Sequence, residues 1–298
     1  IKEIGHEVEV VDGAREFARQ VPMLRNTIDF VFNEAKGIVG ADRKMAVPAL
    51  CRVHEIPFLG TGAYGAMLSR NKWHTSAIAR QAGVPIPRTV LFRDAGEVAK
   101  SHWKHFPALV KPNFESASIG MTDRSLVHTH FELMSQVEHV VSAYRQPAIV
   151  QSFISGYEIQ ISLVGTETPY PLGYTLLTVQ DEVGGRREWI RRRDWDDGHV
   201  SFQPLTDHKI CARLYGYCKR LYRALDLQDY GRLDYRLTPQ GKVYFIESST
   251  HPHLTRRSSF FTAAQSRGHD FVSMIELLIF ESGTRQGLSL SPPKIPCP

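Results

Sequence analysis

The sequence predicts a mixed α/β protein of the α+β kind, and three features lead to this prediction. First, apolar runs at 28–33 and 56–59 end at polar or turn-forming residues and alternate with helical stretches, as buried parallel strands do. Second, residues 158–165 alternate polar and apolar side chains, which is typical of an antiparallel strand covered on one face. Third, residues 232–246 hold two β-rich runs separated by a turn that contains Pro and Gly, which predicts a hairpin.

The other elements follow from the same kinds of pattern. Further strands are expected at 8–11, 84–92, 108–112, 148–154 and 173–179, and helices at 43–53, 71–82, 207–225 and 271–281. Ser69 is a candidate N-cap of the second of these helices, and Gly83 is its expected stop. The helix at 207–225 repeats apolar residues at steps of three and four, which predicts a core face made of Ile210, Leu214, Cys218, Leu221 and Leu225.

A change of pattern at about 70–84 marks the first expected domain boundary. Residues 1–70 then form a small N-terminal domain. The chain begins without Met, and its first residues resemble a helix end that runs into a strand, so we expect this domain to lack its first strand and helix. Residues 71–155 and 156–283 form two further domains, the second with the hairpin, and 284–298 form a Pro- and Ser-rich tail.

Composition narrows the functional classes. The chain has 298 residues, of which 42% are hydrophobic and 22% charged, as in an ordinary soluble α/β protein. No apolar run approaches the length that spans a bilayer and no signal peptide is visible, so we expect a cytoplasmic protein without a membrane partner. The four cysteines form no CxxC pair, which indicates free thiols in a reducing compartment.

The net charge of +5 fits either nucleic acid or small phosphate-bearing molecules as partners. The local basic cluster belongs to a charged, Gly- and Trp-bearing segment at 181–203, which we expect to be a long loop without regular structure. Aspartates beside its arginines and tryptophans disfavour base stacking, so we expect no nucleic-acid partner. One interpretation is a lid that brings an arginine of 191–193 to a phosphoryl group; the other is a solvated loop.

The hairpin predicts a metal site. With the turn as hinge, Asp234 faces Phe245 and Arg232 faces Glu247, so these four side chains share one side of the ribbon. Asp234 and Glu247 are then diagonal neighbours, roughly 5–8 Å apart. Carboxylates that close repel unless a cation lies between them, and Mg²⁺, which normally brings phosphate oxygens with it, fits the gap. The alternative is a solvated edge hairpin laced by salt bridges.

A second phosphate-binding signal lies in the middle of the chain. The strand at 108–112 carries Lys111 near its end, and a loop of small residues follows at 113–121. Small residues let backbone N–H groups close on phosphate oxygens, while the lysine supplies a compact positive charge. A Ser/Gly turn without a ligand explains the same pattern, and no Walker A spacing is present.

Taken together, these features resemble the ATP-grasp ligases, and most closely their D-alanine–D-alanine ligase branch. The resemblance covers roughly residues 28–281. Four segments carry it, in this order and spacing: FLGTGAYGAMLSRNK, ALVKPNFESASIGM, VQSFISGYEIQISL, and GRLDYRL followed by VYFIESSTHPHLT. It implies an ATP-grasp fold, in which a small, N-truncated Rossmann-like domain precedes two α+β subdomains.

The resemblance also implies roles for individual residues. Lys72 and Lys111 correspond to the two lysines that hold the α- and β-phosphates of ATP. Asp234, Glu247 and Ser249 occupy the metal-ligand positions, for Mg²⁺ or Mn²⁺. The phosphate-covering loop, the adenine slot and the ribose contact correspond to Glu115, Ser116, Ser118, Gln151, Ser152, Phe153, Ile154 and Glu158. The catalytic positions are Arg232, Arg193 and Ser258, and the substrate positions are Asn33, Glu34, Arg232 and His253.

Several positions depart from the family pattern. Ser249 replaces the family's metal-binding asparagine, which leaves open whether one or two ions bind. His253 replaces the glycine of the substrate loop, and Gln151 and Ser152 replace a glutamate and a lysine beside the adenine. Residues 33–40 replace the His-Gly-x-x-Gly-Glu-Asp-Gly stretch of the cell-wall ligases. The ATP chemistry therefore transfers to this chain better than the substrate does.

The resemblance implies a ligase that uses ATP and Mg²⁺ to convert a carboxylate into an acylphosphate, which an amine then attacks to give an amide. The expected partners are small amino-acid-like substrates, and a homodimer is a candidate assembly. The alternative is a non-catalytic or regulatory ATP-binding module of the same fold.

Overall fold

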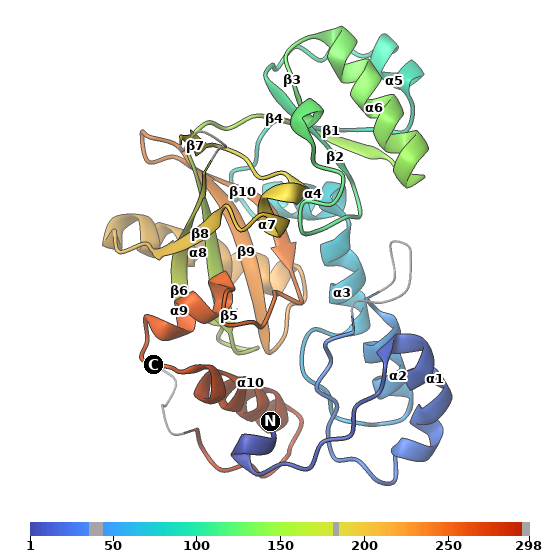
Figure 1. Ribbon diagram of the computed structural model, residues 1–298, viewed down its shortest axis with the longest axis vertical. Coiled ribbons are helices and arrows are strands. Elements are labelled where there is room, and N and C mark those ends of the chain that lie inside the picture. The colour runs from blue at the N-terminus through green and yellow to red at the C-terminus, as the bar shows by residue number, and fades with distance from the viewer. Residues whose placement is uncertain (36–43, 181–184, 294–298) are drawn as a thin grey trace.

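The structure is a computed structural model that describes residues 1–35, 44–180 and 185–293. Its elements are stacked along the long axis of the molecule (Figure 1). A four-stranded sheet with two helices lies at one end, a six-stranded sheet lies in the middle, and N-terminal helices lie with α10 (Phe271–Arg285) at the other end. In the described ranges, no helix has both the length and the apolar character needed to cross a membrane.

The N-terminal region is mainly helical. Its elements are η1 (Lys2–Ile4), α1 (Gly13–Leu24), α2 (Ala46–Val53) and α3 (Ala63–Arg70). Most of the strand pairing predicted here is not observed: residues 8–11 have no regular structure, and the runs at 28–33 and 56–59 share one isolated parallel bridge, between Val31 and Phe58. Ile28, Val31, Ile56 and Phe58 pack with α1 and α2. Phe30, Phe32 and Leu59 belong to a second cluster that contains residues of α9 and α10. Burial against helices therefore explains why these runs are apolar.

The helix predicted at 71–82 is present as α4 (Lys72–Gln81), but its predicted cap is wrong. Ser69 belongs to α3, and the N-cap is Asn71, whose side chain accepts a hydrogen bond from the backbone N–H of His74. Asn71 also accepts a bond from the side chain of Asn113, 2.9 Å away. These two bonds tie the junction between α3 and α4 to the loop after β2. Because Lys72 is the first residue of α4, its backbone is held in place there.

The first sheet is antiparallel, in the order β1-β4-β2-β3. Its strands are β1 (Thr89–Phe92), β2 (Ala108–Pro112), β3 (Leu126–Val127) and β4 (Ala148–Ser152), and η2 (Asp123–Ser125) leads into β3. The helices α5 (Ala95–Lys100) and α6 (His130–Tyr144) cover one face, where Val110, Val137 and Val150 are fully buried. The strand predicted at 108–112 is confirmed, with Lys111 near its end.

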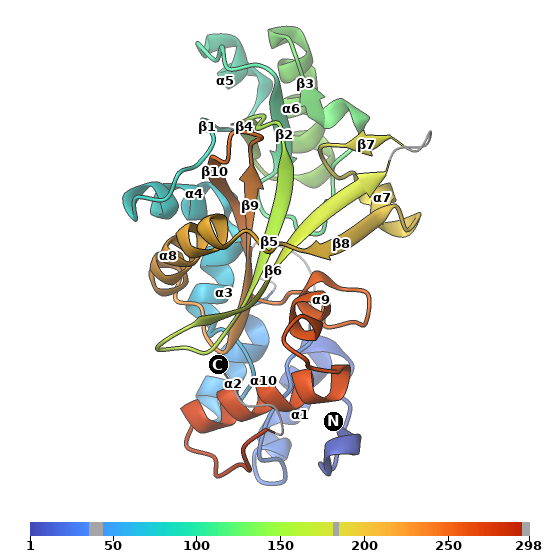
Figure 2. The same cartoon turned by 90° about the vertical axis from the view of Figure 1, so that its left-hand side faces the viewer.

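The second sheet is also antiparallel, in the order β10-β9-β5-β6-β7, and β8 pairs with β6. Figure 2 shows its long strands edge-on, with α8 on one side and α9 on the other. Its elements are β5 (Tyr157–Val164), β6 (Tyr170–Gln180), β7 (Arg186–Arg187), β8 (Val200–Pro204), α8 (His208–Ala224), β9 (Tyr230–Leu237), β10 (Val243–Ser249) and α9 (Ser259–Gln265). The predicted core face of α8 is confirmed, because Leu214, Cys218, Leu221 and Leu225 have no exposed surface.

A glycine allows the two sheets to meet. Gly156 lies between β4 and β5 with a φ of +134°, a backbone conformation that side chains with a Cβ rarely adopt. A Cβ at this position would lie 2.0 Å from the backbone oxygen of Leu237. The chain can therefore pass from one sheet to the other close to the end of β9.

The predicted hairpin is present, but its predicted register is wrong. Tyr235 faces Phe245, and an irregularity between Phe245 and Glu247 then brings Glu247 directly opposite Asp234. Phe245 is fully buried and lies in the core with Tyr235, on the face opposite to Asp234. One extra residue in β10, a β-bulge, moves Glu247 onto the face of Asp234, and no sequence pattern in the hairpin marked it.

The segment predicted at 181–203 as a loop without regular structure contains β7, β8 and the short helix α7 (Arg192–Asp196). Residues 181–184 lie outside the described residues. Leu177 and Val179 of β6 form a small apolar cluster with Ile190, and Trp195 packs against this cluster. The segment is therefore a folded extension of the second sheet, because these apolar side chains give it a core of its own.

Candidate active site

A cleft that encloses about 900 Å³ of space, part of it open solvent, is lined by residues of both sheets. All ten side chains predicted to bind nucleotide line it, together with Arg232, Asp234 and Glu247. Side chains that the sequence analysis did not assign to this site also line it: Leu109, Met121, Gln160, Trp189, Ile190, Trp195, Arg236 and Ile246. The cleft thus brings together residues that lie more than 170 positions apart in the chain.

Two lysines lie in the cleft, Lys72 buried and Lys111 partly buried. The ammonium group of Lys72 lies 3.5 Å from a carboxylate oxygen of Glu247 and donates a hydrogen bond to the backbone oxygen of Glu115. The ammonium group of Lys111 lies 3.4 Å from the side-chain oxygen of Gln151. Burial lowers the pKa of both lysines, and the charge of Glu247 opposes that shift. Two ammonium groups in a partly enclosed cleft suit an anionic ligand such as a polyphosphate.

The two acidic side chains of the hairpin have different environments. Asp234 is 2% exposed and receives two hydrogen bonds of 2.7 Å from the guanidinium group of Arg232. Burial nevertheless raises the pKa of Asp234 to about 7. Burial also acts to raise the pKa of Glu247, but the charges of Lys72 and Lys111 outweigh it and the pKa lies below its usual value.

This pair can hold a divalent cation. Asp234 and Glu247 are direct cross-strand partners on one face of the hairpin, and both offer only oxygen atoms as ligands. Among the described residues, no cluster of three or more His, Cys, Asp or Glu side chains forms a complete metal cage. Two carboxylates without further side-chain ligands fit Mg²⁺, which usually keeps water and phosphate oxygens in its coordination shell.

One wall of the cleft is held by an arginine that the sequence analysis did not assign to the site. Arg236 donates hydrogen bonds to the backbone oxygens of Ile154 and Gly156, at 3.0 and 2.9 Å. These bonds fix the segment that joins β4 to β5, where Phe153 and Ile154 line the cleft. The alternation along β9 contained the signal, because Arg236 shares a face with Arg232 and Asp234.

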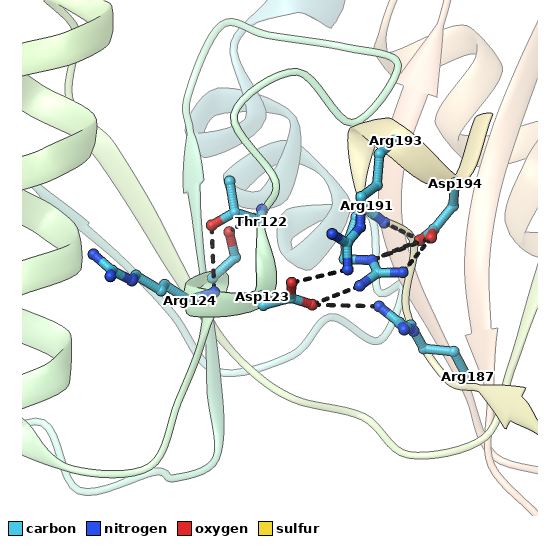
Figure 3. A network of polar contacts seen from close by, with 8 residues as sticks. Thr122, Asp123, Arg124, Arg187, Arg191, Arg193 and Asp194 are labelled. Carbon is cyan, nitrogen blue, oxygen red and sulfur yellow. Dashed lines mark hydrogen bonds and ion pairs between the residues drawn. The ribbon is translucent and has the colours of Figure 1, made fainter. Parts of the chain in front are cut away.

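The segment around α7 is fastened to the loop after β2 by a network of ion pairs (Figure 3). The carboxylate of Asp123 forms ion pairs with the guanidinium groups of Arg187, Arg191 and Arg193, with N–O distances of 3.4, 2.8 and 3.1 Å. Arg191 is 3% exposed and also pairs with Asp194 at 2.7 Å. We call these five residues the Asp123 network.

Two further bonds join the same two segments. The indole N–H of Trp195 donates to the hydroxyl of Ser118 at 3.2 Å, and Arg192 donates to the backbone oxygen of Ala117 at 3.3 Å. Because Ser118 and Trp195 both line the cleft, the two segments together form one side of it.

Comparisons with known proteins show which family the chain resembles. The family model described as "D-ala D-ala ligase C-terminus" matches residues 78–280. The chain belongs to this family. A D-alanine–D-alanine ligase of Aquifex aeolicus is 26% identical over 94% of this chain and 90% of its own length. An uncharacterised protein of Sinorhizobium fredii is 29% identical over 92% of this chain and 82% of its own length.

Solved structures show the same fold. A D-alanine–D-alanine ligase of Bacillus anthracis superimposes with a TM-score of 0.75 at 19% identity, over 96% of this chain and 89% of that chain. A structure of the same protein complexed with ATP gives a TM-score of 0.71 at 20% identity, over 90% of this chain and 84% of that chain. The fold is thus ATP-grasp, and the chain is an ATP-dependent carboxylate–amine ligase of the D-alanine–D-alanine ligase family.

Several predicted site residues of this ligase lie outside the set that lines the cleft. Arg193 is directed at Asp123, and Ser258 is the N-cap of α9, where its hydroxyl accepts from the N–H of Phe261. Ser249 lines a neighbouring smaller pocket. These three assignments stay predictions.

Besides Arg232, the predicted substrate residues are Asn33, Glu34 and His253, and two of these contact or belong to the loop after β10. The side-chain nitrogen of Asn33 lies 3.2 Å from the ring nitrogen Nε2 of His251, and Tyr230 donates to Glu34 at 3.5 Å. His253 lies in the same loop and is exposed. Residues 36–40 of the stretch that replaces the cell-wall ligase motif lie outside the described residues.

Proposed function

We propose that this protein forms an amide bond between an amino-acid-like carboxylate and an amine, and that it requires ATP and Mg²⁺ and proceeds through an acylphosphate. One observation supports this most directly. The carboxylates Asp234 and Glu247 lie in the same cleft as the ammonium groups of the buried Lys72 and the partly buried Lys111. This combination of charges matches a Mg²⁺–triphosphate. Arg232 lies on both oxygens of Asp234 and Lys72 lies beside Glu247, so a bound metal ion would replace some of these contacts.

Each side chain has a role in binding the nucleotide under this proposal. Lys72 and Lys111 neutralise the α- and β-phosphates, and Asp234 and Glu247 hold the metal ion. Gln151, Ser152, Phe153 and Ile154 line the adenine slot, and Glu158 accepts from the ribose hydroxyls. The loop with Glu115, Ser116 and Ser118 covers the phosphates. Mg²⁺, when bound, reduces the negative charge of the phosphate oxygens.

The chemistry then has two steps. A substrate carboxylate oxygen attacks the γ-phosphorus, the bond to the β-phosphate oxygen breaks, and ADP leaves. The amine attacks the acylphosphate carbon, loses a proton to solvent, and phosphate leaves. Arg232, which Asp234 holds by two hydrogen bonds, stabilises the oxyanion that forms on the attacked carbon. Arg193 reaches the γ-phosphate when the Asp123 network opens, and Ser258 assists from the start of α9.

The substrates are amino-acid-like small molecules that differ from those of the cell-wall ligases. Asn33 contacts His251 of the loop after β10, His253 lies in that loop, and Glu34 contacts Tyr230 of β9; these three residues are proposed to contact the substrates. We also propose the division into domains at 1–70, 71–155 and 156–283 with a tail at 284–298, a homodimer, and a cytoplasmic location, where ATP is supplied.

The test is release of ADP. The protein is incubated with ATP, Mg²⁺ and a library of D- and L-amino acids offered singly and in pairs, and products are identified by mass spectrometry. Amino-acid-dependent ADP release with a new amide supports the proposal. ATP binding without turnover on any member of the library favours a non-catalytic nucleotide-binding module.

A further inference from the structure

A smaller pocket of about 310 Å³ adjoins the cleft. It shares Lys72, Glu115, Ser116 and Glu247 with the cleft, so it opens beside the predicted metal and phosphate positions. We call it the side pocket. The described residues that line it are all polar or charged: Lys44, Ser69, Arg70, Lys72, Glu115, Ser116, Glu247, Ser248, Ser249 and Thr250. No described residue with a wholly apolar side chain lines it, so specificity is expected to come from its polar groups.

The charges of the side pocket favour an anion. Three cationic side chains, Lys44, Arg70 and Lys72, line it together with the two carboxylates of Glu115 and Glu247. The sum over these side chains is therefore +1. If Glu247 also serves a metal ion, the positive charge left for a ligand increases.

Arg70 is the centre of this pocket. It is 5% exposed, and its guanidinium group donates to the hydroxyl of Ser116 at 3.0 Å and lies 3.8 Å from a carboxylate oxygen of Glu115. Two neighbours thus hold a buried guanidinium group in place at the pocket wall. A fixed, planar group of this kind recognises carboxylates with two parallel hydrogen bonds.

Two hydroxyl groups provide an independent sign of a ligand. The Oγ atoms of Ser69 and Ser248 are buried and have no hydrogen-bond partner among the described residues. Ser69 as a whole is 8% exposed. Buried hydroxyl groups are normally hydrogen-bonded. Two buried hydroxyl groups without a partner in one small pocket therefore indicate a polar ligand that would bond to them.

We propose that the side pocket receives the negatively charged side chain of the amino-acid substrate, so that the enzyme acts on dicarboxylic amino acids. This rests on the proposed ligase function. A carboxylate side chain would lie beside the cationic groups of Lys44 and Arg70 and accept hydrogen bonds from Ser69 and Ser248. A second anionic group, the phosphoryl group transferred from ATP, could occupy the same pocket. The experiments below distinguish it from a substrate carboxylate.

The first measurement compares isosteric substrates. Aspartate and asparagine, and glutamate and glutamine, each in both D and L forms, are titrated into the full chain with ADP and Mg²⁺ by calorimetry. ADP release in the presence of ATP is measured in parallel. The acid is expected to bind roughly tenfold or more tightly than its amide, as one hydrogen-bonded ion pair allows. Equal binding of acids and amides overturns the proposal whether or not ADP is released, whereas failure of the ligase function appears as binding without ADP release.

The second measurement replaces Arg70 by Met. Arg70→Met is expected to lower the preference for the acid roughly tenfold or more and to weaken ADP and ATP binding by a smaller factor, because Arg70 also holds Ser116 of the phosphate-covering loop. Loss of ATP affinity with an unchanged preference would show that the pocket binds the phosphoryl group, which overturns the proposal. Arg223→Met, on the exposed face of α8, is the matched control and is expected to change neither quantity. Far-UV circular dichroism and the melting temperature establish that both variants are folded.

Discussion

The protein contains two clusters in which aspartate meets arginine, and they behave in opposite ways. In the cleft, Arg232 holds Asp234, which is 2% exposed, and burial raises the pKa of that aspartate to about 7. In the Asp123 network, the aspartate side chain is 62% exposed, and its hydrogen bond to Arg191 lowers its pKa. Pairing with arginine therefore does not compensate the lost hydration of Asp234, whereas it stabilises the charged form of Asp123.

The reason is solvation. A carboxylate that loses water needs more compensation than one arginine supplies, while an exposed carboxylate keeps its hydration and gains from every nearby cation. The buried cluster is therefore suited to take up a metal ion. The exposed cluster is suited to hold the segment around α7 reversibly against the loop after β2.

The largest effect is expected in the buried cluster. Glu247→Gln removes a negative charge without changing shape, so the metal and the two lysines lose their common partner. We expect kcat to fall by roughly 100-fold or more while the fold is kept. The measurement is amino-acid-dependent ADP release together with the melting temperature. A large fall in melting temperature at unchanged activity would mean that Glu247 is structural.

The second expectation concerns Lys111, whose positive charge faces the acidic side chains of the cleft. Lys111→Ala removes a partly buried ammonium group that the proposal places on a phosphate. The KM for ATP should increase by roughly tenfold or more, with a smaller effect on the amino-acid KM. Lys219→Ala, a lysine on α8 that packs over Tyr215, is the control. Unchanged ATP kinetics in the first variant would reject the assignment of Lys111.

A smaller effect is expected from the exposed cluster. Asp123→Asn weakens the ion pairs to Arg187, Arg191 and Arg193, so the segment around α7 should separate more readily from the loop that carries Ser118. We expect ADP to dissociate several-fold faster, measured by stopped-flow displacement of a fluorescent nucleotide. The melting temperature should change little, because exposed ion pairs contribute little to stability. Glu138→Gln on α6 serves as the exposed control; equal dissociation rates for the two variants would contradict a closing role.

The smallest expected effect is the dependence of the Asp123 network on pH. The pKa of Asp123 is lower in the folded protein than in the unfolded chain, because Arg191 stabilises the charged form. Its contribution to stability is therefore complete above the unfolded pKa and is lost as the pH falls through the folded pKa. The difference in melting temperature between the wild type and Asp123→Asn should stay constant from pH 5 to 8 and shrink below about pH 4. A difference that instead grows on acidification would reverse the assigned sign.

Much of the fold and of the cleft was predictable from the sequence, because the signals are local. The alternation along β5, the apolar stripe of α8 and the lysine in β2 each depend on neighbours within a few residues. The predictions failed where pairing depends on distant segments. The N-terminal apolar runs are buried by helices, and the cap of α4 is the residue that also contacts Asn113.

The sequence by itself determined the family, through four segments that resemble the ATP-grasp ligases, and it indicated a phosphate-binding lysine at Lys111 and a pair of carboxylates at Asp234 and Glu247. The role of Lys72 came from the resemblance alone. Only the tertiary structure decided how these residues meet. The bulge in β10 sets Glu247 against Asp234, three arginines converge on Asp123, and Arg70 is buried beside Ser116. The physical reason is that backbone preferences act over a few residues, whereas register, burial and ion pairing depend on which distant surfaces are packed together.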